Sequence, residues 1–266
     1  MSDLSNENII HVKKENVEYI QFRRLLEYPE IKHCYTLRKH GINIKKEEDN
    51  DQILQESYQK IGNALGWNKE DILKPHQTHT DIVEKVINSA QVLEEVDGVI
   101  TNQKNITLCT TSADCTSLLF YDPVKKVIAD THSGWRGTLQ KIGQKTVTKM
   151  IKEYGSNPID IICCICPCIQ KCHFEVEEDV MNLFSEQFHD IIAKDQIIEK
   201  GKIKNGKQKY QIDTTKINQY LLKQIGLKEE NIINSNLCTV CHAEEFHSYR
   251  VDKEKSGRNA AMISII

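Results

Sequence analysis

The sequence lacks the features that take a chain into a membrane or onto nucleic acid. No apolar run approaches the roughly 18 residues that a membrane-spanning helix needs. Lys and Arg number 35 against 38 Asp and Glu, and the net charge of −3 gives no electrostatic attraction to nucleic acid or to an anionic membrane. The first residues are polar and acidic, unlike a signal peptide. We therefore expect a cytoplasmic protein without nucleic-acid or membrane partners.

Internal repeats, low-complexity linkers and a clear domain boundary are also missing. A chain of 266 residues with 39% hydrophobic content suits one large globular unit. We expect residues 1–266 to form a single domain, either as a monomer or as a small homo-oligomer.

Cysteine, in contrast, is abundant, with ten residues in the chain. Without a secretion signal, reduced thiols are expected rather than disulfides. Five cysteines lie between Cys163 and Cys172, and Cys238 and Cys241 form a C-x-x-C pair. This clustering leaves a second metal site open as an alternative to buried structural thiols.

The hydrophobic pattern mixes adjacent strands with helices. The 3-to-4 spacing of apolar residues predicts a helix over 49–66 and another over 139–154 that Gly155 ends. Asn205-Gly206 predicts a hairpin turn. Further strands are predicted over 17–22, 31–37, 82–86, 96–101, 118–121, 127–129, 159–165 and 261–266. Further helices are predicted over 177–188 and 212–222. This order favours an α+β fold with mixed sheets.

The stretch from Thr107 to Thr138 carries most of the chemistry. Cys115 lies near one predicted strand, and His132 leaves the end of another. His79 lies upstream in the segment Gln77-Thr78-His79. One cysteine and two histidines form a familiar zinc set with one position left open for water or substrate. The spacing is not that of a zinc finger. From spacing alone, Cys115 could also be a buried thiol and the two histidines ordinary surface residues that bind no metal.

Five segments occur in an order that resembles the YfiH/YlmD family. They are QTH, SADC, HSGWRGT, CPCI followed by FEV, and a final group of CT, SYR and SGR. The resemblance runs from about Cys34 to the C-terminus. It implies a single catalytic domain with a sandwich-like β core flanked by helices. It also implies zinc held by His79, Cys115 and His132.

This family was long labelled laccase-like polyphenol oxidase, and its members are now described as zinc-dependent purine nucleoside enzymes. The resemblance therefore implies phosphorolysis of adenosine, inosine and methylthioadenosine, with phosphate as co-substrate, and deamination of adenosine. Asp114, Cys115 and His132 are the expected catalytic residues, with Asp114 either an acid–base group, a support for a metal ligand or a turn cap.

A phosphate site is expected at Arg136, just before the helix that we place directly after Gly137. The N–H groups and the positive end of that helix would help to hold an anion. Arg38 is a second candidate, although the glycine pair that follows it in the family is missing here. Arg250 and Arg258 are weaker candidates. His76 is expected to face away from the metal, and His247 to lie on the surface.

Three other functions compete with this interpretation. A copper-dependent polyphenol oxidase would need many more histidines, and the chain has no H-x-H pair. A cysteine hydrolase would use Cys115 as nucleophile and His132 as base, without a metal. A non-catalytic, metal-stabilised interaction module is the third, and no charge run supports it.

Overall fold

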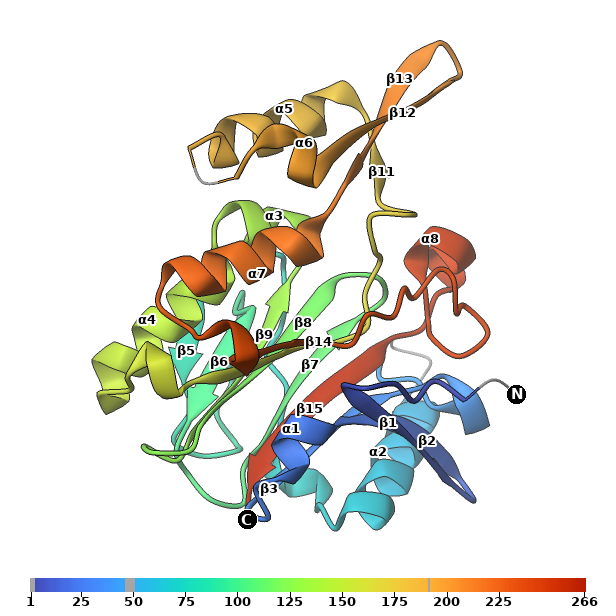
Figure 1. The fold of residues 1–266 in the computed structure, drawn as a ribbon. Coiled ribbons are helices and arrows are strands. Elements are labelled where there is room, and N and C mark those ends of the chain that lie inside the picture. The colour runs from blue at the N-terminus through green and yellow to red at the C-terminus, as the bar shows by residue number, and fades with distance from the viewer. Residues whose placement is uncertain (1–2, 46–50, 191) are drawn as a thin grey trace.

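Two six-stranded sheets lie face to face in the computed structural model, which describes residues 3–45, 51–190 and 192–266 (Figure 1). The first sheet has the order β1 (Ile9–Lys14), β2 (Val17–Phe22), β3 (Ile31–Thr36), β15 (Asn259–Ile265), β7 (Thr107–Ser112) and β4 (Ile72–Leu73). The second has the order β14 (Ile232–Asn234), β10 (Ile162–Ile165), β8 (Thr116–Asp122), β9 (Val127–Ser133), β6 (Gly98–Thr101) and β5 (Val83–Lys85). Most neighbouring strands are antiparallel, but β10 with β14, β5 with β6 and β4 with β7 are parallel. The predicted α+β fold with mixed sheets in a sandwich is confirmed.

The central strand β8 shows why the sequence forms two layers of core. Leu119 and Tyr121 belong to the core between the sheets, whereas Leu118 and Phe120 belong to the core on the opposite face. Side chains of a strand alternate between its faces, and both faces of β8 are covered. A strand buried on both faces reads as a continuous apolar run rather than as an alternating one.

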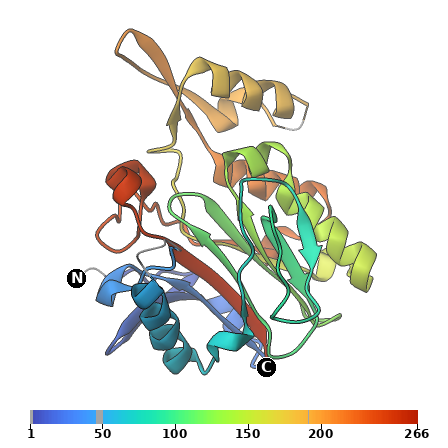
Figure 2. The same cartoon turned by 180° about the vertical axis from the view of Figure 1, so that it is seen from behind.

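Helices cover the outer faces of both sheets, as the two opposite views show (Figures 1 and 2). Helix α2 (Asp51–Leu65) packs Leu54 and Ile61 on the first sheet. Helices α4 (Ile142–Tyr154) and α7 (Thr214–Gln224) cover the second sheet. The predicted helix over 49–66 is confirmed from Asp51, and residues 49–50 lie outside the described residues. Short helices α1 (Arg23–Leu26) and α8 (Tyr249–Asp252) lie on the connections.

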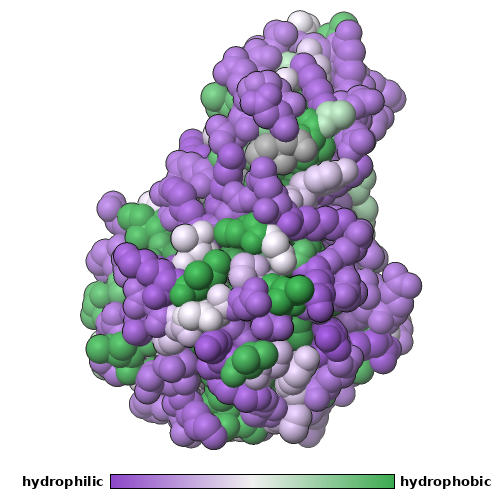
Figure 3. Space-filling view, turned by 60° about the vertical axis from the view of Figure 1, so that its left-hand side comes forward, coloured by the Kyte–Doolittle hydropathy of each residue, from purple (hydrophilic) through white to green (hydrophobic). Residues whose placement is uncertain are grey.

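A separate small lobe extends from the sandwich. It contains the three-stranded sheet β11 (Glu175–Val176), β13 (Lys207–Ile212) and β12 (Ile198–Lys204) with helices α5 (Glu178–Phe188) and α6 (Lys194–Ile197). The predicted hairpin is confirmed, with Asn205 and Gly206 both at positive φ, as a tight hairpin turn requires. The surface around this lobe is mostly hydrophilic (Figure 3). No helix among the described residues is long and apolar enough to span a membrane.

One predicted helix start is wrong. The short helix α3 (Trp135–Leu139) follows Gly134, and the long helix α4 begins only at Ile142. Lys141 lies between them with a left-handed φ of 61°, which ends one helix before the next begins. The N-terminus of the long helix therefore does not lie at Gly137, and the expected anion site on it is not supported.

Candidate active site

His79, Cys115 and His132 converge from three separate segments. His79 lies on the loop before β5, Cys115 directly precedes β8, and His132 lies near the end of β9. Strands β8 and β9 are paired so that Ser117 faces His132, which brings Cys115 to the same end of the hairpin. The metal-binding atoms of the three residues all lie within 4.8 Å of one another. This group could hold a metal ion, as the sequence predicts.

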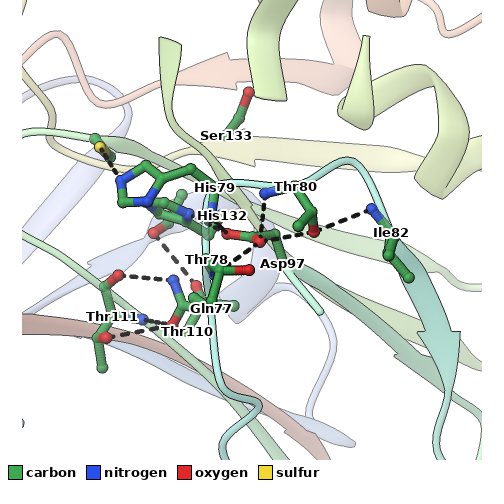
Figure 4. A network of polar contacts seen from close by, with 12 residues as sticks. Gln77, Thr78, His79, Thr80, Ile82, Asp97, Thr110, Thr111, His132 and Ser133 are labelled. Carbon is green, nitrogen blue, oxygen red and sulfur yellow. Dashed lines mark hydrogen bonds and ion pairs between the residues drawn. The ribbon is translucent and has the colours of Figure 1, made fainter. Parts of the chain in front are cut away.

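Asp97, at the start of β6, organises two of the three residues (Figure 4). Its carboxylate is fully buried and accepts a hydrogen bond from His132 Nδ1 at 2.7 Å. It also accepts bonds from the backbone N–H groups of Thr78, His79 and Thr80 at 3.2, 3.2 and 2.7 Å, and from the Thr80 hydroxyl at 2.8 Å. A single side chain therefore fixes the His79 loop and occupies Nδ1 of His132, so that Nε2 is the ring nitrogen available to a metal. A carboxylate behind a metal-binding histidine is typical of zinc sites.

The backbone at His79 has a left-handed φ of 64°. Residues other than glycine adopt this region rarely, and such residues cluster at functional sites. Gln77 anchors the same loop to β7, because its side chain donates to Thr111 O at 2.9 Å and accepts from Thr111 N at 2.8 Å. In the QTH segment, Gln77 thus anchors the loop, and His79 is the residue that meets Cys115 and His132.

Electrostatic attraction shifts the pKa values of Cys115, His132 and Asp97. Burial alone would raise the pKa of the Cys115 thiol, but the charge of His132 and hydrogen bonds from His132 and His79 lower it to about 6. Burial would lower the pKa of His132, but Cys115 and Asp97 raise it to about 10. Burial would likewise raise the pKa of Asp97, and its bonds to His132 and Thr80 instead hold it below the ordinary value. The lowered pKa of Cys115 favours its thiolate, which is the form that binds metals and attacks electrophiles.

The three residues open into a cavity of about 430 Å³. Its volume is typical of small-molecule sites. Aromatic residues and two arginines share the wall with the Cys/His group, namely Trp135, Phe174, Tyr249, Arg250 and Arg258. Gly134 lies against the Cys/His group, since a Cβ there would lie 2.9 Å from Cδ2 of His79 and 3.3 Å from Sγ of Cys115. Glycine, which has no Cβ, allows the two side chains to approach this strand end closely.

Asp114 lies beside the group, with a left-handed φ of 88° and 8% of its surface exposed. Its Oδ1 accepts from the Thr239 hydroxyl and its Oδ2 from the backbone N–H of Arg250, both at 2.6 Å. Its carbonyl accepts from Ile169 N at 2.8 Å. Asp114 therefore ties three distant segments of the cavity wall together.

A family model described as multi-copper polyphenol oxidoreductase laccase matches residues 34–266. The chain belongs to this family. It is 31% identical over 234 residues to purine nucleoside phosphorylase YlmD of Bacillus subtilis. This match covers 85% of this chain and 81% of that protein. It is 30% identical over 250 residues to a human purine nucleoside phosphorylase, covering 88% of this chain and 55% of that longer protein.

The fold agrees with this assignment. The crystal structure of a hypothetical protein YfiH of Bacillus licheniformis superposes with a TM-score of 0.84 at 25% identity, covering 96% of this chain and 99% of that one. The resemblance to the YfiH/YlmD family that the motifs indicate is confirmed.

The arginines are arranged differently from the sequence-based expectation. Arg136 is exposed and its guanidinium lies 4.5 Å from the centre of the Trp135 ring, outside the residues that line the cavity. Arg38 also lies away from the cavity, where it bonds Asp252 at 2.9 Å and Ala243 O at 3.0 Å. The structure instead brings Arg250 and Arg258 to the cavity.

Two further histidines were assigned from the sequence. His76 is exposed and pairs with Glu94 at 2.6 Å, away from the metal-binding group. The surface position expected for His247 is wrong, because its ring is buried, with Nε2 at 2.8 Å from Ile42 O. Burial lowers the pKa of His247 to about 4. The final motif around His247 therefore packs into the sandwich.

Sequence reasoning missed Asp97 and Thr239. Asp97 was visible only as part of an Asp-Gly turn before a buried strand. A buried aspartate at such a turn is more often a turn cap, so nothing in its local pattern indicates that it reaches His132, 35 residues away. Thr239 lies 125 residues from Asp114 and no spacing rule connects them.

Proposed function

We propose that the chain is a zinc-dependent purine nucleoside phosphorylase that accepts adenosine, inosine and methylthioadenosine and that also deaminates adenosine. The observation that carries the proposal is the arrangement of one thiol and two imidazoles beside two arginines in one cavity. The names of the relatives from Bacillus subtilis and human support the phosphorylase activity.

Zinc suits the donor set. One thiolate and two imidazoles are common zinc ligands in sites that keep a position open. Bound there, zinc would supply a Lewis acid for a substrate oxygen or an activated water. The orientation of His132 by Asp97 fits a ligand prepared for a metal, because the bond to Nδ1 fixes the ring and its tautomer.

Phosphorolysis requires that a phosphate oxygen bonds C1′ of the ribose while the bond from C1′ to the purine nitrogen breaks. The purine leaves with the bonding electron pair and takes up a proton. We place phosphate near Arg250 and Arg258, whose guanidinium groups suit phosphate oxygens. Phe174 and Tyr249 offer faces on which a purine can stack. Asp114 positions this wall, since both its oxygens already accept hydrogen bonds.

A cysteine hydrolase remains the second candidate, because the lowered pKa of Cys115 also suits a nucleophile. The copper oxidase has less support. Blue-copper sites do use a His₂Cys set, but multicopper oxidases need further histidine clusters. Within the described residues, the only other group that could hold a metal is rich in cysteine and has one histidine.

The deciding experiment is one incubation of purified protein with adenosine, with and without phosphate, followed by product analysis. Adenine and ribose 1-phosphate that form only with phosphate demonstrate phosphorolysis, and inosine demonstrates deamination. Turnover that survives thorough chelation would favour the cysteine hydrolase, and absence of any nucleoside product would refute the proposal.

The position of phosphate gives a further prediction. Arg258→Ala is expected to raise the KM for phosphate by about tenfold or more, because charge-assisted hydrogen bonds contribute roughly 1.5–3 kcal/mol each. Arg258→Lys should recover only part, since an ammonium lacks the two-pronged geometry. Deamination, which uses water, should fall less. Initial rates over a phosphate series measure the effect.

Arg136→Ala is the matched comparison, because it removes an arginine that lies outside the cavity. If Arg136→Ala raises the KM for phosphate and Arg258→Ala does not, the assignment from the sequence is right and the one proposed here is wrong.

A further inference from the structure

A second group of metal-binding side chains lies at the base of the small lobe. It consists of Cys172, His173, Cys238 and Cys241, whose donor atoms all lie within 4.8 Å of one another. The group shares no residue with His79, Cys115 and His132. It combines a Cys-His neighbour pair with a C-x-x-C pair, 65 residues further along the chain.

The backbone brings these two pairs together. Cys168 and Cys238 form a parallel β-bridge, in which Cys168 N donates to Leu237 O at 3.3 Å and Thr239 N donates to Cys168 O at 3.1 Å. Both pairs then lie in tight turns, with His173 N bonded to Gln170 O at 2.9 Å and His242 N bonded to Cys238 O at 3.1 Å. Turns held in this way direct the four side chains to one point.

The distances fit a tetrahedron around a zinc ion. With bonds of about 2.3 Å to sulfur and 2.0–2.1 Å to nitrogen, the edges would be about 3.8 Å between sulfurs and about 3.5 Å between sulfur and nitrogen. The Sγ atoms of Cys172 and Cys241 are 3.8 Å apart. His173 Nδ1 lies 3.2, 3.6 and 3.5 Å from the sulfurs of Cys172, Cys238 and Cys241.

A disulfide or an iron–sulfur cluster fits these four side chains less well than zinc. A disulfide needs a sulfur separation near 2.05 Å and would join only two of the cysteines, which leaves the third cysteine and the histidine without a part. Iron–sulfur clusters are usually held by four cysteines, and their ligands surround several iron and sulfide ions, whereas the four donor atoms here surround a single point. Three cysteines and one histidine are a common closed set for structural zinc.

We propose that Cys172, His173, Cys238 and Cys241 bind a second zinc ion that has a structural role. The site joins the 168–176 segment, which carries Phe174 of the cavity wall, to the segment that leads to Arg250. Arg250 Nη1 already donates to His173 O at 2.9 Å and to Glu175 O at 3.4 Å. The ion would fix this wall of the cavity and the segment that leads through β11 into the lobe, whose course Figure 1 shows.

The test is metal analysis of the purified full-length chain, and it does not depend on which reaction the chain catalyses. We expect about two zinc ions per chain in the unmodified protein and about one in Cys241→Ser. Cys241 is exposed, so this substitution does not disturb the core. Cys164→Ala, which removes a thiol from the core between the sheets, is the control and should leave the zinc content unchanged.

A second measurement on the unmodified protein avoids any folding defect. Cys172 and Cys241 are exposed and should react slowly with a thiol reagent while zinc is bound, and quickly after chelation. Unchanged zinc content in Cys241→Ser, rapid reaction of both thiols in the metal-loaded protein, or iron with inorganic sulfide in the sample would each overturn the proposal.

Discussion

Cys115→Ser is expected to lose the metal of the active site and to lower kcat/KM by at least about a hundredfold. Substitutions that act only behind a metal ligand already cost 10–100-fold in affinity or activity, and Cys115 is itself one of the three proposed ligands. Serine keeps the size of the side chain but not the thiolate, which the neighbouring imidazoles favour here. Zinc analysis and nucleoside turnover on the same preparation measure both effects.

Loss of stability must be separated from loss of the ligand. Cys164→Ala removes a fully buried thiol from the core between the sheets and should lower the melting temperature while the zinc content and turnover persist. Cys115→Ser that keeps its zinc would show that Cys115 does not bind it. If Cys115→Ser keeps its zinc and loses only its turnover, Cys115 acts as a nucleophile, and this result supports the cysteine hydrolase.

The sequence predicts individual strands, turns and helix ends well because their signals are local, whereas the sandwich follows only from the family resemblance. The apolar run of β8, the Asn205-Gly206 turn of the small lobe and Gly155 at the end of α4 each act within a few residues. The break at Lys141 is different, because lysine does not favour a left-handed φ. Tertiary packing imposes that conformation, and helix periodicity therefore starts the long helix at Leu139, whereas it begins at Ile142.

The proposed metal ligands are predictable from the sequence only through the family motifs. The residues that hold these ligands and the cavity wall in place are not predictable, because they act through contacts between residues far apart in the chain. Asp114 meets Thr239 and Arg250 across 125 and 136 residues. The same applies to the proposed phosphate site. The sequence favours Arg136 because of its place in a glycine-rich motif, but its side chain stacks on Trp135.

For the cysteine clusters, the structure decides between alternatives that the sequence leaves open. Spacing alone leaves a second metal and ordinary buried thiols as alternatives for the cysteines of 163–172. The structure separates them, since Cys163, Cys164 and Cys166 lie in the sandwich cores or beside them, whereas Cys172 turns outward to Cys241. Strand alternation explains the inward thiols, and the β-bridge between Cys168 and Cys238 explains the outward ones.

The second large effect is expected at Asp97. Asp97→Asn should weaken zinc binding by about 10–100-fold, because a carboxylate behind a ligand histidine contributes on that scale. The amide has one acceptor oxygen where the carboxylate has two, and its NH₂ group would face N–H donors that now point at Asp97. Both the orientation of His132 and the His79 loop are expected to relax, so turnover at limiting zinc should fall in proportion.

Asp122→Asn provides the matched control for this prediction. Asp122 is also a fully buried carboxylate on the β8–β9 hairpin, but it accepts from Val124 N and Lys125 N at the opposite end from the cavity. Its replacement should lower stability without changing zinc affinity. Zinc titration of both variants, with turnover measured again at saturating zinc, separates a loss of zinc affinity from a loss of stability.

If excess zinc restores turnover in Asp97→Asn, the residue acts by positioning the ligands, as the geometry requires. If zinc affinity is unchanged in Asp97→Asn and falls in Asp122→Asn, the role assigned to Asp97 is wrong.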